Sequence, residues 1–163
     1  MLFEIIEHLA IAQHISIIED EEGVSYLMRR AVSKINPGAL VHTFGNFREL
    51  EAFDMTGSSH VVLSDYNFPI DSTGIIAPNA RLVFEHVFGK CSAFAITTFS
   101  QRLEDSDADL ERYRVEKSKF LSLDHASYRR LPKDDGVFSP GKIKPPSNAP
   151  INLTVRNPRI VKR

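Results

Sequence analysis

The sequence predicts an α/β fold with a doubly wound, parallel sheet of five strands and helices on both faces. Short segments rich in β-branched and other apolar residues occur five times between residues 14 and 123. Between them lie segments whose apolar residues recur at helical spacing, or loops that contain proline and glycine. Strands that alternate with helices are typical of a parallel sheet covered on both faces.

The composition indicates one domain of ordinary globular type. The chain has 163 residues, of which 42% are hydrophobic and 25% charged, and a chain of this size buries a core without disulfides or metals. Its formal net charge of −1 argues against a general nucleic-acid or membrane binder. A single cysteine, the lack of a long apolar run and the lack of a signal-peptide pattern predict a soluble, cytoplasmic protein.

An amphipathic helix at residues 1–13 is the first expected element. Leu2, Ile5, Ile6 and Leu9 fall on one face of this helix. The helix either covers part of the core or makes a contact with a partner, which includes a second copy of the chain. It is also a candidate to replace the cover that a shortened last helix would leave out.

The domain itself is expected at residues 14–131 and opens with a strand, an acidic turn and a helix. The strand, at 15–18, leads into four acidic residues at 19–22. Apolar residues then recur at helical spacing over 24–35, and Pro37 lies just beyond the end of that helix.

The alternation of strands and helices continues along the chain. Asn46 is expected to cap a helix at 47–55, and Gly89 to end a helix at 80–88. The other expected elements are strands at 39–44, 60–64 and 93–97, a charged helix at 106–118, a fifth strand at 120–123 and a shortened last helix at 124–131. Four phenylalanines are expected in the core, namely Phe84, Phe88, Phe94 and Phe99.

The composition changes abruptly after residue 131. Residues 132–163 hold six of the nine prolines and carry seven Lys or Arg against two Asp, a net charge of 7 − 2 = +5. This composition predicts an extended or disordered basic tail. The tail is either solvated or docks on an acidic partner or anionic surface.

Polar residues follow three of the predicted strands at the point where each strand ends. Glu19 and Asp20 follow the first, Asp65 follows the third, and Thr97 and Thr98 follow the fourth. Because the carboxyl ends of parallel strands meet at one edge of a sheet, these side chains are expected to share a site. Crowded carboxylates repel one another unless a cation is present, and oxygen ligands suit Mg²⁺. A metal there would let a carboxylate act as nucleophile towards a phosphoryl group.

Three segments resemble the receiver domains of bacterial two-component response regulators. HISIIEDEEGVSYLMRRAV resembles their first strand, acidic pair and first helix, and AFAITTFS resembles their fourth strand with its switch hydroxyl. VVLSDYNFP resembles their phosphorylation-site strand and is similar to that of single-domain chemotaxis regulators. The segments occur in the order of the family within residues 14–124. The resemblance implies a flavodoxin-like receiver fold.

The resemblance further implies a single-domain response regulator. Asp65 would be the phosphoacceptor and a Mg²⁺ ligand, Asp20 would bind the metal directly, and Glu19 would hold a metal-bound water. The backbone carbonyl of Asn67 would be a further metal ligand, and Thr97 the switch hydroxyl. The phosphodonor would be a histidine kinase or a phosphotransfer protein, and the signal would pass by protein–protein contact to a downstream target.

Departures from the family pattern leave an alternative open. With the fifth strand at 120–123, Leu123 stands where receiver domains carry a lysine that pairs with the phosphoryl group. Thr98 stands where alanine or glycine is usual, and Phe99 is apolar where an attacking water would be held. The alternative is a pseudo-receiver, which acts as a protein-binding adaptor without phosphorylation.

Overall fold

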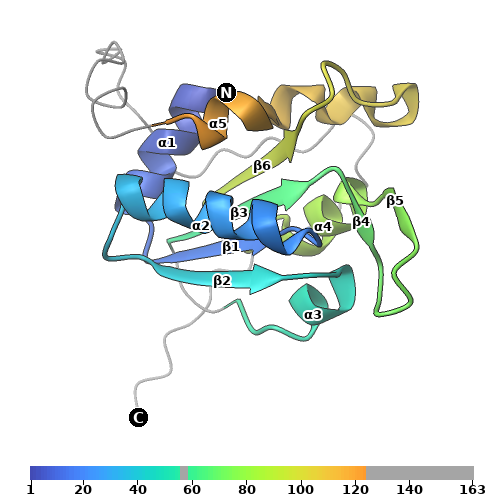
Figure 1. Cartoon of the computed structure of the whole chain (residues 1–163), viewed down its shortest axis with the longest axis horizontal. Helices are drawn as coiled ribbons and strands as arrows, with labels where there is room; N and C mark the ends of the chain where they lie inside the picture. Colours follow the sequence, from blue (N-terminus) through green and yellow to red (C-terminus); the bar gives the residue numbers. More distant parts are fainter. Residues whose placement is uncertain (56–58, 124–163) are drawn as a thin grey trace.

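A five-stranded, all-parallel sheet forms the centre of the computed structural model, which describes residues 1–55 and 59–123. The strand order is β2-β1-β3-β6-β7 (Figure 1). The strands are β1 (His14–Ile18), β2 (Leu40–Phe44), β3 (His60–Asp65), β6 (Ala93–Thr98) and β7 (Arg114–Glu116). The predicted α/β class with a doubly wound parallel sheet is therefore confirmed, and the order is that of flavodoxin-like folds.

The strand order reverses between β1 and β3, which places their carboxyl ends side by side. From β1 the chain first adds β2 on one side and then crosses to β3 on the other. Ile18 at the end of β1 pairs in register with Ser64, and Asp65 at the end of β3 pairs with Thr97 of β6. Such a switch point is where open α/β sheets bind ligands.

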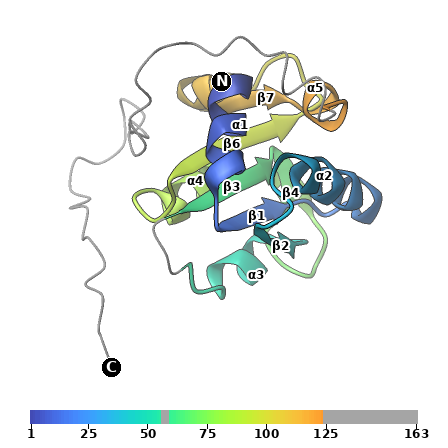
Figure 2. The same ribbon diagram turned by 90° about the vertical axis from the view of Figure 1, so that its left-hand side faces the viewer.

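Helices cover both faces of the sheet. On one face lie α1 (Leu2–Ile11), α2 (Glu22–Ile35) and α5 (Lys117–Leu121). On the other lie α3 (Phe47–Glu51), α4 (Ala80–Val87) and the 3-10 helix η1 (Asp105–Tyr113). Figure 2, which looks along the sheet, shows α2 and α5 on one side of the strands and α4 on the other.

The alternation of side chains along each strand divides the core into two layers. In β1, Ile15 and Ile17 face the α1, α2 and α5 layer, whereas Ile18 faces the α3 and α4 layer. All three isoleucines are fully buried, as expected for a strand covered on both faces. Burial on both faces is the reason that the sequence of β1 is a nearly continuous apolar run.

Helix α1 covers part of the core of its own chain. Ile5, Ile6 and Leu9 are buried in the same cluster as α2 and α5. The side-chain amide of Asn36, just after α2, donates hydrogen bonds of 2.9 Å to the carbonyl oxygens of Leu9 and Ala12. The core-covering interpretation is therefore confirmed, while a homodimer through this helix stays a prediction.

The end of the described chain differs from the prediction. The expected helix at 106–118 is a 3-10 helix at Asp105–Tyr113 followed by strand β7, and the expected strand at 120–123 is helix α5 and its end. Strand β7 has one buried apolar residue, Val115, between two charged residues. Because so short an edge strand shows no run of apolar residues, its composition matched a charged helix instead.

Smaller differences concern the loops. The loop expected after Asp65 contains an antiparallel hairpin of β4 (Asn67–Pro69) and β5 (Ile76–Pro78). Helix α3 is shorter than predicted, but Asn46 does cap it, since its side-chain oxygen accepts a hydrogen bond from Glu49 N–H. The expected helix at 124–131 and the tail at 132–163 lie outside the described residues. Within the described ranges, no helix combines the length and the apolar character needed to cross a membrane.

Candidate functional site

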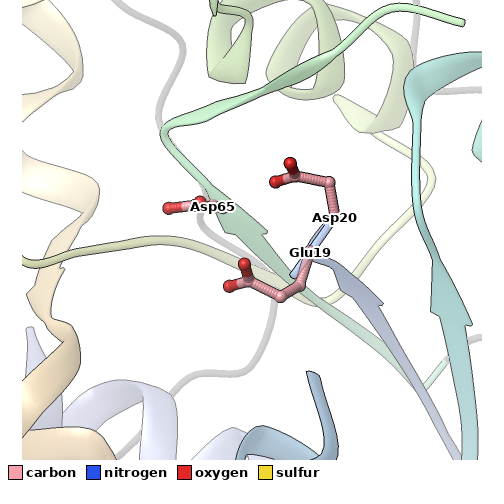
Figure 3. Close-up of side chains that lie close together, drawn as sticks. All are labelled: Glu19, Asp20 and Asp65. Atoms are coloured by element: carbon pink, nitrogen blue, oxygen red, sulfur yellow. The ribbon is translucent and has the colours of Figure 1, made fainter. Parts of the chain in front are cut away.

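Three carboxylates converge at the carboxyl edge of the sheet, as the sequence predicts. Glu19 and Asp20 follow β1, and Asp65 ends the neighbouring strand β3 (Figure 3). Each of the three offers a carboxylate oxygen, and these oxygens lie within 4.8 Å of one another. Glu19 is buried, Asp65 is half-buried and Asp20 is exposed, so the cluster is open to solvent on one side.

A buried lysine, which the sequence analysis did not place here, joins two of these carboxylates. Nζ of Lys117 lies 2.7 Å from Oε2 of Glu19 and 2.8 Å from Oδ1 of Asp65. The side chains of Lys117 and Glu19 are each 3% exposed, so this ion pair is shielded from water. The assignment of Leu123 to the lysine position is wrong, because Leu123 is a buried core residue after α5.

The register of β7 explains how Lys117 reaches the site. Val115 pairs with Thr97, and Glu116 pairs with Thr98, so the next residue leaves the sheet beside the end of β6. The signal in the sequence was a lysine directly after a charged–apolar–charged triplet, Arg114 to Glu116. Three residues give too short a pattern to separate a strand from part of a helix.

Burial dominates the electrostatics of the cluster. Loss of hydration raises the pKa of Glu19 and the pKa of Asp65, and the hydrogen bonds from Lys117 oppose both shifts without cancelling them. The charge of Asp65 raises the pKa of Glu19 further. The site therefore disfavours full ionisation of its carboxylates in the absence of a further cation.

Replacement of Asp65 by asparagine is expected to change how stability depends on pH. Because its folded-state pKa is raised, Asp65 contributes stability that is present below about pH 4 and is lost as the pH rises through the folded-state value. Asparagine does not titrate, so the metal-free Asp65→Asn variant does not lose this contribution. Its free energy of unfolding, relative to that of the parent, should therefore increase as the pH rises from about 4 to 7. Urea unfolding of both proteins across this range measures the difference. A difference that stays constant with pH would contradict the assigned shift.

Two donors engage the same oxygen of Asp65. The backbone N–H of Tyr66 donates a hydrogen bond of 2.7 Å to Oδ1, the oxygen that Lys117 also contacts. Both contacts hold the carboxylate in one orientation at the end of β3. Among the described residues, both of these contacts fall on Oδ1.

The predicted threonines lie beside the carboxylate cluster on β6. Thr97 is buried, and its Oγ1 donates a hydrogen bond of 3.4 Å to the carbonyl oxygen of Ser64. Thr98 is also buried, and its hydroxyl accepts a hydrogen bond from Ser100 N–H. Phe99 was expected in the core but is 61% exposed, and its ring centroid lies 5.2 Å from Nζ of Lys117. The core assignment of Phe99 is wrong.

Asn67 was also predicted as a site residue, but it is not one of the three residues of the carboxylate cluster. It begins β4, two residues beyond Asp65, and it is exposed. The metal-ligand role of its backbone carbonyl stays a prediction.

No match was found in three comparisons with known proteins. No family model, no curated protein and no solved structure matches the chain. The function must therefore be inferred from the residues and their geometry.

The donor set at the site fits a divalent cation. Three carboxylates and one ammonium group leave a net charge of −3 + 1 = −2 when all are ionised. The carboxylates supply only oxygen ligands, which suit Mg²⁺ and other hard cations, and the exposed side of the cluster leaves room for bound waters. These features do not select Mg²⁺ over other hard divalent ions.

Proposed function

We propose that this chain is a receiver-like signalling domain that accepts a phosphoryl group on Asp65 with the help of Mg²⁺. The observation that carries the proposal is the contact of Lys117 with both Glu19 and Asp65. A buried ammonium group beside a buried carboxylate supplies a fixed positive charge where a phosphoryl group would arrive. Lys117 therefore supports the resemblance, which implies a cation at this place.

Transfer to Asp65 is an in-line displacement. A carboxylate oxygen of Asp65 attacks phosphorus, and the bond between phosphorus and the imidazole nitrogen of a phosphohistidine donor breaks. The electron pair of that bond returns to the imidazole, and the product is an acyl phosphate on Asp65. Asp20 and Asp65, with Glu19 through a water, would hold the metal, and the bound ion would neutralise charge on the phosphoryl oxygens.

Two residues next to Asp65, Lys117 and Thr97, would assist this transfer. Lys117 opposes the rise in the pKa of Asp65 and so favours the ionised form that attacks, and it can then pair with a phosphoryl oxygen instead of Oδ1. The hydroxyl of Thr97, on the next strand in register with Asp65, is placed to donate to another phosphoryl oxygen once it releases Ser64.

The proposed partners are a histidine kinase or phosphotransfer protein as donor, and a downstream protein that reads the phosphorylated state. Large apolar residues are exposed around the carboxyl edge, which supports recognition by protein contact. They are Ile70, Ile75 and Ile76 on the β4–β5 hairpin and Phe99 after β6.

The adaptor alternative has lost the observation that favoured it. That observation was Leu123 in place of the lysine, whereas Lys117 occupies the site and Leu123 lies in the core. We therefore favour the phosphorylated switch.

Incubation with acetyl phosphate and Mg²⁺ tests the proposal. We expect intact-mass spectrometry to show one added phosphoryl group in the parent, and none in Asp65→Asn or when the metal is chelated, because Asp65 is the nucleophile and needs the metal beside it. Asp105→Asn is the matched control, since the side chain of Asp105 is 90% exposed and lies outside the cluster. An equal gain of mass in Asp65→Asn, or no gain in the parent, would contradict the proposal.

A further inference from the structure

Three histidines gather on the face of the sheet that α3 and α4 cover, towards the amino ends of the strands. They come from three neighbouring strands: His42 from β2, His14 from β1 and His60 from β3. Their ring centroids lie 5.7 Å apart for His14 and His42, 5.7 Å for His14 and His60, and 6.4 Å for His42 and His60. The proposed phosphorylation chemistry uses none of them.

One nitrogen of this histidine cluster is buried without a partner. His60 is 1% exposed, and its Nε2 lies 2.8 Å from the hydroxyl oxygen of Ser16. Its other nitrogen, Nδ1, has no hydrogen-bond partner among the described residues. A buried polar atom without a partner is unfavourable and calls for an explanation, such as an ion that binds there.

The spacing of the other two rings suits a shared metal ion. Nδ1 of His14 and Nε2 of His42 lie 3.4 Å apart, which is long for a hydrogen bond. Two imidazole nitrogens bound to one tetrahedral zinc at about 2.0–2.1 Å are about 3.4 Å apart. The same geometry places the ring centroids about 5 Å apart, somewhat less than the separations of the three histidines.

We propose that His14, His42 and His60 bind a late first-row divalent metal ion, best represented by Zn²⁺. The ligand atoms are Nδ1 of His14, Nε2 of His42 and Nδ1 of His60, and a water completes the tetrahedron. Ser16 then accepts the Nε2–H of His60, which is the usual second contact of a metal-bound histidine. Imidazole ligands favour zinc, copper and nickel over magnesium.

Two of the three histidines have lowered pKa values. Burial and the two neighbouring histidines lower the pKa of His60 to about 4, and burial also lowers the pKa of His42. Metal binding requires neutral rings, and both shifts act in that direction. Among the described residues only the acidic cluster already brings three ligand atoms within 4.8 Å of one another, so binding by the histidines includes an adjustment of side-chain torsions.

This site is separate from the acidic cluster. His14 and His60 are the first residues of β1 and β3, whereas Glu19 follows the last residue of β1 and Asp65 is the last residue of β3. The sheet thus has nitrogen ligands towards one end and oxygen ligands at the other. A borderline ion such as Zn²⁺ would prefer the histidines, and a hard ion such as Mg²⁺ would prefer the carboxylates.

Zinc titration of the metal-free full chain at pH 7 tests the inference, with excess Mg²⁺ present to occupy the acidic cluster. We expect one equivalent of Zn²⁺ to bind, and binding should weaken at least about 100-fold in His14→Gln and in His42→Gln, because each variant removes a ligand. Both residues are half-buried, so these variants leave the buried His60 in place. His86→Gln, on α4, is the matched control and should bind zinc as the parent does.

Two further readouts keep the inference falsifiable. Co²⁺ in place of Zn²⁺ should give the visible absorption of a tetrahedral complex in the parent and in His86→Gln only. Zinc should shift the ring proton resonances of His14, His42 and His60 and leave those of His86 unchanged. Absence of saturable binding, or equal binding by His42→Gln and the parent, would overturn the inference, whatever the outcome of the phosphorylation test.

Discussion

Replacement of Lys117 by methionine is expected to lower the free energy of unfolding of the metal-free chain by about 3 kcal/mol at pH 7. The variant keeps the length of the side chain but leaves the buried Glu19 and the half-buried Asp65 without their shared cation. Removal of one partner from a buried ion pair typically costs about 3–5 kcal/mol, because the remaining charge is desolvated and unpaired. Urea unfolding followed by circular dichroism gives the free energy directly.

Lys119→Met is the matched control for this experiment. Lys119 lies two residues further along the same helix, but its side chain is 68% exposed and, among the described residues, forms its ion pair with Glu116 on the surface. We expect a change of less than about 0.5 kcal/mol for this variant. Equal stability of Lys117→Met and Lys119→Met would show that the buried ion pair does not exist as described.

Replacement of Leu9 by alanine is expected to cost about 3–4 kcal/mol. Leu9 lies on the apolar face of α1, is 0% exposed and packs in the cluster formed with α2 and α5. Leucine-to-alanine changes at such positions lose the burial of the side chain and leave a cavity, and measured costs range from about 2.7 to 5.0 kcal/mol. Chemical unfolding of the purified variant measures the loss.

Ile11→Ala supplies the comparison within the same helix, since Ile11 is 62% exposed. Its effect should stay below about 0.5 kcal/mol. Removal of residues 1–12 should destabilise the chain more than Leu9→Ala, because it also removes the buried Ile5 and Ile6. A truncated chain as stable as the parent would contradict the role of α1 as cover for the sheet.

Much of the fold could be predicted because its central strands are buried on both faces. Such strands appear in the sequence as short, nearly continuous apolar runs, of which HVVLS before Asp65 is an example. Helix ends were also visible, since Asn46 caps α3 and Gly89 takes a positive φ after α4. The positions of Glu19, Asp20, Asp65 and Thr97 followed from these elements.

The rest could not be predicted because it depends on contacts distant in the sequence. Strand β7 is defined by its pairing with β6, and its own three residues carry one apolar side chain. The ion pair between Lys117 and Glu19 spans 98 residues, so no local pattern reveals it. The exposure of Phe99 likewise reflects its place beyond the end of β6.

The two proposed sites differ in what the sequence alone revealed. The acidic residues follow strand ends, so the parallel topology predicts that they meet. The histidines lie within strands, and their meeting depends on the side-chain register of β1, β2 and β3. Residues on one face of neighbouring strands become neighbours only when that register is known.

Residue-level mapping of the phosphorylated chain is the most direct test of the central claim, that Asp65 accepts a phosphoryl group in a site built with Lys117. Borohydride reduces an acyl phosphate to the corresponding alcohol, which converts a phosphorylated aspartate to homoserine. After treatment with acetyl phosphate and Mg²⁺, tandem mass spectrometry is expected to find homoserine at position 65 and aspartate at positions 20 and 105. Homoserine at another position, or a phosphate ester on Ser64 or Thr97 with aspartate intact at position 65, would contradict the account.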